Sequence, residues 1–482
     1  MRGVMRAPLL LVLLGASLAA CSSSSGGDVP SVDAGGAAFT YTPAGCAYGV
    51  SPPDSRAFTG LALDDGAAPG DPAGAAPVRV RVGLGGGTTA GAPGYADPTT
   101  SAAFTWETVL AFNGAKVRLG NAPGALSDVH TGYSWALGAS TFHEAHVCGL
   151  TAGKTYYYQV GGGASGAEVW SATQTFTTVP DSGPITIGVS GDARDSATTF
   201  QLVNQRMRDA AVAFQLFSGD LVLLGTTEGF FSQWLDEIWK DPNDATKFLT
   251  LGQQLFLPVG GNHEAQAAPY YANFALPGEG PYAESFASFD VQTVHFVLLD
   301  DQAIADTIAD EATAHLAWLE ADLAHAEANR TKVPFLVVVH HRGEFSTSMH
   351  NADPDVVQAR ASLVPVWDKH HVDLVLNGHD HNYERTKPVT GPVASPVVAP
   401  STTTGTTYVV CAGAGADAYP PGTTPAAYRQ TNTGFGTGTP YVGVYSLLTI
   451  DKRTLTYKAY GLTVAGGSVA GDTLIDSFAL QR

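Results

Sequence analysis

Two patterns of hydrophobic spacing divide the chain near residue 180. From residue 39 to 179, short apolar runs alternate with Gly and Pro clusters, and in one of them Val78, Val80 and Val82 alternate with arginines. Such alternation buries one face of a strand. Because no helix-length amphipathic segment interrupts these runs, residues 39–180 are predicted to form an immunoglobulin- or fibronectin type III-like β-sandwich.

After residue 184, strand-like and helix-like segments alternate. Apolar strands are expected at 185–190, 214–218, 254–259, 293–299, 335–339 and 372–376, and helices at 198–213, 228–240, 311–328 and 355–371. This alternation predicts an α/β layer architecture. Further strand-like runs after residue 406 are expected to complete a second sheet, so residues 181–482 are predicted to form one α/β domain.

Five of these predicted strands run into polar motifs. The motifs are Gly191-Asp192-Ala193-Arg194, Gly219-Asp220, Gly260-Gly261-Asn262-His263-Glu264, His340-His341 and Gly378-His379-Asp380-His381. Ligands of open α/β sheets bind outside the carboxyl ends of the strands, so we expect the five motifs to converge. Carboxylate, amide and imidazole donors without a thiolate favour Zn, Mn or Fe. Six donors exceed the need of one ion, which favours two ions sharing a carboxylate.

The order of these motifs resembles that of the calcineurin-like metallophosphoesterases. Residues 378–385, Gly-His-Asp-His-Asn-Tyr-Glu-Arg, together with the preceding sandwich, resemble the purple acid phosphatase branch. The resemblance implies a four-layer αββα domain, two divalent or trivalent metal ions (Fe, Zn or Mn) and hydrolysis of phosphate esters.

Carried over residue by residue, the resemblance also implies a ligand set. Asp192 and His381 would hold one ion and Asp220 would bridge both, while the second ion would be bound by Asn262, His340 and His379. His340 is preferred to His341 because its spacing from Val337 fits the family pattern.

The resemblance further assigns two residues to the substrate. His263 would contact phosphate and assist the leaving group as the catalytic residue, and His350 is a weaker substrate-binding candidate. Arg194 stands where other metallophosphoesterases carry a histidine, and arginine cannot deprotonate to become a ligand. It is expected to face the phosphate or, alternatively, to pair with Asp195 or Asp192.

A second departure from the family is Leu223, which stands where purple acid phosphatases carry a tyrosine, three residues after the bridging aspartate. The family tyrosine helps to select ferric iron and gives the purple colour. A coloured Fe(III) site is therefore not expected here.

The N-terminus is typical of an exported lipoprotein. Arg2 and Arg6 precede an apolar stretch that ends at residue 20, shorter than the ~20 apolar residues of a spanning helix, which predicts a signal peptide over residues 1–20. The following Cys21 resembles a lipobox cysteine, which implies lipid attachment; an ordinary signal peptide with a chance cysteine is the alternative. Residues 21–38 would form a flexible Ser/Gly tether. We expect a membrane-anchored protein at the periplasmic face or the cell surface.

Charge and cysteines add two expectations. The formal net charge of −19 argues against nucleic-acid binding, because an acidic surface repels phosphate backbones. After export, Cys46 and Cys148 are the plausible disulfide pair, and Cys411, within a strand-like run, is expected to be a small buried hydrophobe.

The function expected from these features is hydrolysis of small phosphomonoesters by a metal-activated hydroxide. A phosphodiesterase or nucleotidase with the same site is the close alternative. A non-catalytic surface-binding lipoprotein with a degenerate site is the second alternative, motivated by Leu223 and Arg194.

Overall fold

The structure is a computed structural model that describes residues 39, 41–50, 58–86, 97–241, 244–248, 251–277, 284–423 and 425–482. The predicted signal peptide and tether, with Cys21, lie outside the described residues. Residues 39–482 belong to one structural unit. Within the described ranges, no helix has both the length and the apolar character needed to cross a membrane.

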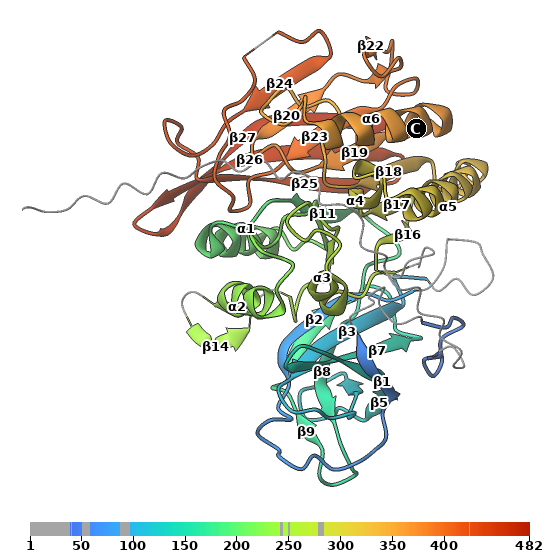
Figure 1. Cartoon of the computed structure of the whole chain (residues 1–482), viewed down its shortest axis with the longest axis vertical. Coiled ribbons are helices and arrows are strands. Elements are labelled where there is room, and N and C mark those ends of the chain that lie inside the picture. Colours follow the sequence, from blue (N-terminus) through green and yellow to red (C-terminus); the bar gives the residue numbers. More distant parts are fainter. Residues whose placement is uncertain are drawn as a thin grey trace, which may run out of the picture. The chain divides into compact units, whose positions relative to one another are not determined.

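The first part of this unit is a β-sandwich of two five-stranded sheets (Figure 1). One sheet has the order β1-β6-β7-β3-β2, with β1 Thr59–Leu63, β2 Val78–Leu84, β3 Ser101–Thr108, β6 Tyr133–Leu137 and β7 Ser140–Cys148. The other has the order β10-β8-β4-β5, with β9 beside β8; its strands are β4 Lys116–Gly120, β5 Asp128–Thr131, β8 Thr155–Gly162, β9 Val169–Trp170 and β10 Gln174–Thr177. Phe104, Tyr158 and Phe176 pack ring against ring between the sheets. The predicted β-sandwich is confirmed.

A six-stranded sheet opens the α/β part. Its order is β15-β12-β11-β25-β26-β27, with β11 Ile185–Ser190, β12 Gln215–Phe217, β15 Phe256–Pro258, β25 Gly443–Asp451, β26 Thr454–Ala465 and β27 Ser468–Gln481. The first three strands are parallel and the last three antiparallel. Helix α1 (Ala197–Asp209) covers one face of this sheet. It packs so closely that a Cβ atom added at Gly188 would lie only 2.6 Å from Met207 Sδ. The Ser196 hydroxyl accepts the Thr199 amide hydrogen and so caps this helix.

The second sheet has the order β16-β17-β18-β19-β23-β20-β24. Its strands are β16 Phe286–Val291, β17 Val294–Leu299, β18 Phe335–Val339, β19 Leu374–Asn377, β20 Tyr383–Thr386, β23 Thr407–Cys411 and β24 Arg429–Thr433. Successive side chains of strand β18 point to opposite faces of the sheet. Val337 and Val339 belong to the core shared with the first sheet, whereas Leu336 and Val338 belong to a second core between this sheet and the helices described next.

Helices α4 (Gln302–Ala305), α5 (Ala309–Ala328) and α6 (Pro354–His370) supply that helix-side core and lie together beside β17, β18 and β19 (Figure 1). The two sheets are therefore packed face to face, with α1 on one outer face and α4–α6 on the other. The remaining described elements are α2 Glu228–Trp239, α3 Ala268–Asn273, β13 Lys240–Asp241, β14 Asp244–Phe248, β21 Val389–Thr390 and β22 Val397–Val398.

Polar bonds join the sandwich to the α/β part. The Val82 amide donates to the carbonyl of Leu251 at 2.7 Å, and the Thr105 hydroxyl donates to the carbonyl of Asn273 at 3.0 Å. Strand β3 is consequently buried along its whole length, because one face meets the second sheet of the sandwich and the other meets the α/β part.

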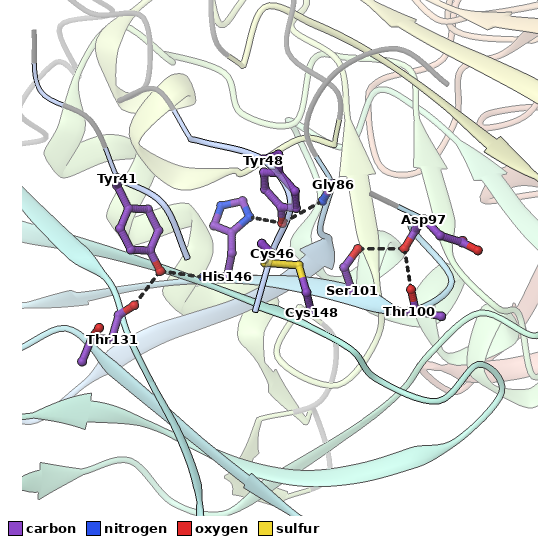
Figure 2. Close-up of a disulfide and its surroundings, with 10 residues drawn as sticks. All are labelled: Tyr41, Cys46, Tyr48, Gly86, Asp97, Thr100, Ser101, Thr131, His146 and Cys148. Carbon is purple, nitrogen blue, oxygen red and sulfur yellow. Dashed lines mark hydrogen bonds between the residues drawn. A yellow bond between two sulfur atoms is a disulfide. The ribbon is translucent and has the colours of Figure 1, made fainter. Parts of the chain in front are cut away.

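The predicted disulfide between Cys46 and Cys148 is confirmed, and Cys411 is free and buried (Figure 2). The surroundings of the bridge are well bonded. The Tyr48 hydroxyl lies 3.0 Å from His146 Nδ1 and accepts the Gly86 amide hydrogen, while the Tyr41 hydroxyl donates to the carbonyl of Thr131. The bridge therefore ties the segment around residue 46 to the end of β7.

Removing this bridge is expected to lower the free energy of unfolding by about 4 kcal/mol, because it closes a span of 102 residues in the unfolded chain. The double variant Cys46→Ser/Cys148→Ser, followed by urea unfolding, measures the effect. Reductant should lower the stability of the wild type to that of the variant and leave the variant unchanged. Equal stabilities of the two oxidised proteins would contradict the expectation.

A buried charge cluster joins β16, β17 and α5. His295 Nδ1 lies 2.7 Å from Asp290 Oδ1, and its Nε2 lies 2.9 Å from Asp322 Oδ2. Burial alone would lower the pKa of His295, but the charges of Asp322 and Asp290 outweigh it and raise the pKa to about 10. The folded state therefore holds the charged imidazole well above its usual pH range.

The contribution of His295 to stability should depend on pH. Since its pKa is raised on folding, the stabilisation is full below the unfolded value of 6.5 and is lost as the pH rises through about 10. We expect His295→Gln to cost about 3 kcal/mol at pH 6 and progressively less toward pH 10, as measured by urea unfolding. The matched control is His325→Gln, an exposed histidine on α5. A cost that does not vary with pH would refute the charged pair.

Candidate metal centre

The turns after β11, β12 and β19 bring polar residues together in an uncommon backbone conformation. Asp192, Asp220 and His379 have positive φ values of 57°, 56° and 71°. Such values cost energy in residues other than glycine and persist where the surroundings enforce them. Neighbouring glycines make room: a Cβ on Gly261 would lie 2.3 Å from Asp220 Oδ1, and one on Gly378 would lie 2.5 Å from Asp192 Oδ2.

Four side chains from four strand ends converge on one point. Asn262 Oδ1 lies 3.0 Å from His341 Nε2 and 2.9 Å from His379 Nδ1. The two imidazole nitrogens are 3.2 Å apart, and His341 Nε2 lies 3.3 Å from Asp220 Oδ1. Ligand atoms about 2.1 Å from one ion lie roughly 3.0–3.4 Å apart, so this donor set fits a single metal ion. Asp192, Asp220 and His341 together are also placed closely enough to hold a metal ion.

The protonation of the two histidines suits metal binding. His341 Nδ1 lies 2.7 Å from the carbonyl of Ser218 and donates to it, so a metal ion that displaces the proton from Nε2 would find the lone pair of Nε2 facing the other donors. Burial would lower the pKa of His341, but the Asp220 carboxylate outweighs it and raises the pKa to about 10. Burial and the charge of His341 hold the pKa of His379 well below its usual value, so His379 is neutral. The negative charge of Asp220, which favours a proton on His341, would equally favour a divalent cation in the place of that proton.

Asp220 carries the negative charge of this donor set. Burial disfavours its ionised form, but the charge of His341 and the bonds from His341 and His263 hold its pKa well below the usual range. Glu264, fully buried, accepts the backbone amide hydrogens of Asp220, Gly261 and Val222 at 2.8–3.1 Å. This carboxylate therefore ties the turn after β12 to the turn after β15.

The structure corrects the prediction of His340. Both of its ring nitrogens are engaged elsewhere, Nδ1 at 2.9 Å from Asp301 Oδ2 and Nε2 at 2.9 Å from Glu344 Oε1. The alternation of side chains along β18 explains why His341, and not His340, reaches the site. Residue 340 lies on the same side of the strand as Leu336 and Val338, which face the helices. His341 lies on the other side and reaches the donors of the first sheet.

Of the other two predicted ligands, His381 contacts Arg194 and lies near Asp192. His381 Nε2 is 3.5 Å from Asp192 Oδ1, and Arg194 Nε is 3.7 Å from Asp220 Oδ2. Arg194 Nη2 donates to His381 Nε2 at 3.3 Å and to the Tyr419 hydroxyl at 3.2 Å. Asp195 Oδ2 lies 3.9 Å from Arg194 Nε, so the predicted pairing with Asp195 is a marginal contact beside those with the histidines.

His263 lies at the same edge of the cluster. Its amide donates to Asp220 Oδ1 at 3.0 Å, and its ring Nδ1 donates to the carbonyl of Leu223 at 2.8 Å. The Nε2 atom accepts from Arg194 Nη1 and lies 3.8 Å from Asp220 Oδ2. Leu223, at the position of the family tyrosine, thus contributes its backbone carbonyl, while its side chain is 37% exposed. A quarter of the His263 side chain is exposed, which leaves it accessible to a substrate.

His350 lies beside the donors and not among them. Its ring centroid is 4.4 Å from that of His379 and 5.2 Å from that of Tyr419. Its amide donates to Asp380 Oδ1, and its Nδ1 lies 2.7 Å from Asp353 Oδ2. The structure therefore places His350 at the rim of the site.

Sequence reasoning missed Tyr419 and left Glu264 without a role. Tyr419 follows β23, which runs parallel to β19, so its loop leaves the same edge of the sheet as His379 and His381. Its ring stacks on His381 with centroids 3.9 Å apart and an interplanar angle of 10°. A strand-end rule applied to residues 407–411 would have pointed to this loop.

Comparison with known proteins agrees with this architecture. The purple acid phosphatase N-terminal domain family matches residues 93–178. Purple acid phosphatase 18 of Arabidopsis thaliana is 28% identical over 301 residues, 59% of this chain and 63% of its own length. Purple acid phosphatase 21 of the same plant is 30% identical over 260 residues, 51% of this chain and 54% of its own length. The chain thus spans less than two thirds of these curated relatives.

A solved structure shares the fold. The purple acid phosphatase from yellow lupin (Lupinus luteus) seeds superposes with a TM-score of 0.66 at 17% identity, covering 84% of this chain and 74% of that one. The chain is therefore a homologue of the purple acid phosphatases and shares the fold of the lupin enzyme, in which a β-sandwich is combined with an α/β domain.

Proposed function

We propose that this purple acid phosphatase homologue hydrolyses phosphate esters with a metal ion bound by Asp220, Asn262, His341 and His379. The observation that carries the proposal is the convergence of these four donors, with 2.9–3.3 Å between neighbouring ligand atoms. His341 holds its lone pair toward the centre through its bond to Ser218, and Glu264 braces the backbone beneath Asp220. Such support is expected of a site that must keep its geometry through a reaction.

The chemistry follows from charge. Asp220, Asn262, His341 and His379 would hold a cation there, and its charge would favour ionisation of a nearby water near neutral pH. Arg194, whose terminal nitrogens contact the partly exposed His263 and the Tyr419 hydroxyl, would donate to phosphoryl oxygens and offset their charge. His263 Nε2 lies at the same edge and, once protonated, can donate its proton to the departing ester oxygen. Tyr419 positions the guanidinium through its hydroxyl.

Phosphomonoesters are the proposed substrates. The guanidinium of Arg194, the imidazole of His263 and the hydroxyl of Tyr419 present several donors to one position. This arrangement suits the doubly charged terminal phosphate of a monoester better than the single charge of a diester. The dinuclear form predicted from the motifs would add a second ion beside Asp192 and His381, where Arg194 lies.

Hydrolysis of aryl phosphate esters tests the proposal. The metal-stripped chain is assayed alone and after addition of Mn²⁺, Zn²⁺ or Fe²⁺, with an aryl monoester and the matching diester. We expect hydrolysis that returns with metal and is faster for the monoester. A folded, metal-loaded chain that cleaves neither ester would support the non-catalytic alternative, and faster cleavage of the diester would favour a phosphodiesterase.

Two finer expectations rest on sequence. We propose a fibronectin type III-like topology for the sandwich, supported by its division into two sheets of antiparallel strands. Lipid attachment at Cys21 and export to the periplasmic face or cell surface stay predictions from the N-terminal pattern.

A further inference from the structure

Arg194 places a permanent positive charge inside the donor cluster. Its side chain is 12% exposed and leaves the turn after β11. Nη1 donates to His263 Nε2, Nη2 donates to His381 Nε2, and Nε lies 3.7 Å from Asp220 Oδ2. A guanidinium does not lose its proton in proteins, so this charge is present at every working pH.

The bond to His381 uses the electron pair that a metal ion would need. His381 Nδ1 lies 2.5 Å from the carbonyl of Asp417 and donates to it, so Nε2 carries the single lone pair of the ring. Arg194 Nη2–H points at that lone pair from 3.3 Å. The stacked ring of Tyr419 and its hydroxyl, which accepts from the same Nη2, hold both groups in this arrangement. Coordination by His381 and this hydrogen bond therefore exclude each other.

The remaining donors on this side do not make a second cation site. Asp192 Oδ1 already accepts the His379 amide hydrogen at 3.0 Å, and Asp192 Oδ2 is buried without a hydrogen-bond partner, but a divalent ion needs more ligands than this one oxygen. Asp220 would have to serve a divalent ion while its Oδ2 faces the guanidinium. Like charges this close, in a buried setting, repel strongly. The Asp192, Asp220 and His381 side thus does not fit the second ion that the motifs predicted.

We propose that the Arg194 guanidinium takes the place of this second ion, so that the centre binds one divalent cation per chain, at Asp220, Asn262, His341 and His379. The inference deepens the proposed function and rests on it. Arg194 lies 3.7 Å from Asp220 Oδ2, where it offsets the charge of that carboxylate, and at the same time presents a planar fork to phosphoryl oxygens. Selection of the phosphate group thus depends on a side chain of this protein on one side and on a bound ion on the other.

Metal stoichiometry tests the proposal. The purified chain is saturated with Mn²⁺, freed of excess metal by equilibrium dialysis and analysed for manganese per chain, and its EPR spectrum is recorded. We expect one ion per chain with the spectrum of an isolated Mn²⁺. Arg194→Gln, which removes the charge and frees the His381 lone pair, and Arg194→His, which adds a donor, should each bind a second ion and show exchange coupling.

The matched control is Asp195→Asn, which changes a charge beside Arg194 and should leave one ion per chain. Circular dichroism tests whether each variant is folded. If both Arg194 variants unfold, the number of manganese ions bound per wild-type chain decides the question. Two coupled ions in the wild type, or one ion in folded Arg194 variants, would overturn the inference while leaving metal-dependent hydrolysis intact. A folded wild type that binds no ion and cleaves no ester would instead defeat the proposed function itself.

Discussion

Replacing His341 by glutamine is expected to lower kcat/KM for phosphate esters at least about 1000-fold and to abolish tight metal binding. His341 Nε2 lies within 3.3 Å of the ligand atoms of Asp220, Asn262 and His379, so it is the donor that touches all the others. Loss of one of four ligands leaves an ion with a weakened charge and an altered geometry. Metal analysis and steady-state kinetics on the same preparation measure both effects.

The neighbouring residue supplies the control for this prediction. His340→Gln removes a buried imidazole held by Asp301 and Glu344, so it should lower the free energy of unfolding by about 3 kcal/mol. Its metal content should stay that of the wild type. The opposite pattern, with metal lost in the His340 variant and kept in the His341 variant, would restore the ligand set predicted from the motif spacing.

Replacing His263 by alanine is expected to lower kcat about 100- to 1000-fold while the metal content stays that of the wild type. The Nε2 atom of His263 lies at the exposed edge of the cluster beside Arg194 and is held there by the bond from Nδ1 to the Leu223 carbonyl. None of the four donors is bonded to its ring at close range; the nearest, Asp220 Oδ2, is 3.8 Å from Nε2. Its loss should therefore act on proton transfer and not on metal affinity.

The leaving group separates this role from a structural one. If His263 donates a proton to the ester oxygen, the variant should lose far more rate with alkyl esters, whose alkoxides leave poorly, than with aryl esters that need no proton. The exposed His325→Ala on α5 serves as the control and should retain wild-type kcat. An equal loss with both esters would remove His263 from proton transfer, and unchanged turnover would remove it from the mechanism.

Much of the fold could be predicted from hydrophobic spacing because the central strands are apolar on both faces. The expected ranges 185–190 and 335–339 coincide with β11 and β18, whose residues are almost entirely buried. Helix α5 likewise ends at Ala328 as expected, and begins two residues earlier. Short strands such as β12 and β15 are less well placed, since their ends depend on partners in the sheet and not on local pattern.

The site was predictable as a gathering of strand ends but not in its details. The choice between His340 and His341 depends on which face of β18 continues past its last residue. Leu336 and Val338 point to one core and Val337 to the other, so the alternation of these residues shows which histidine faces the site. It does so only when it is known which core lies beside the helices, and the sequence does not show this. The contact of Arg194 with His381 depends on rotamers and on the loop that carries Tyr419, and neither is visible in the order of the motifs.

The most direct test of the account is a crystal structure of the chain soaked in Mn²⁺, with anomalous diffraction used to locate the metal. We expect a manganese peak in contact with Asp220 Oδ1, Asn262 Oδ1, His341 Nε2 and His379 Nδ1. A manganese peak bound by His340 would contradict this metal site. So would a crystal that has taken up manganese elsewhere but shows none between these four atoms.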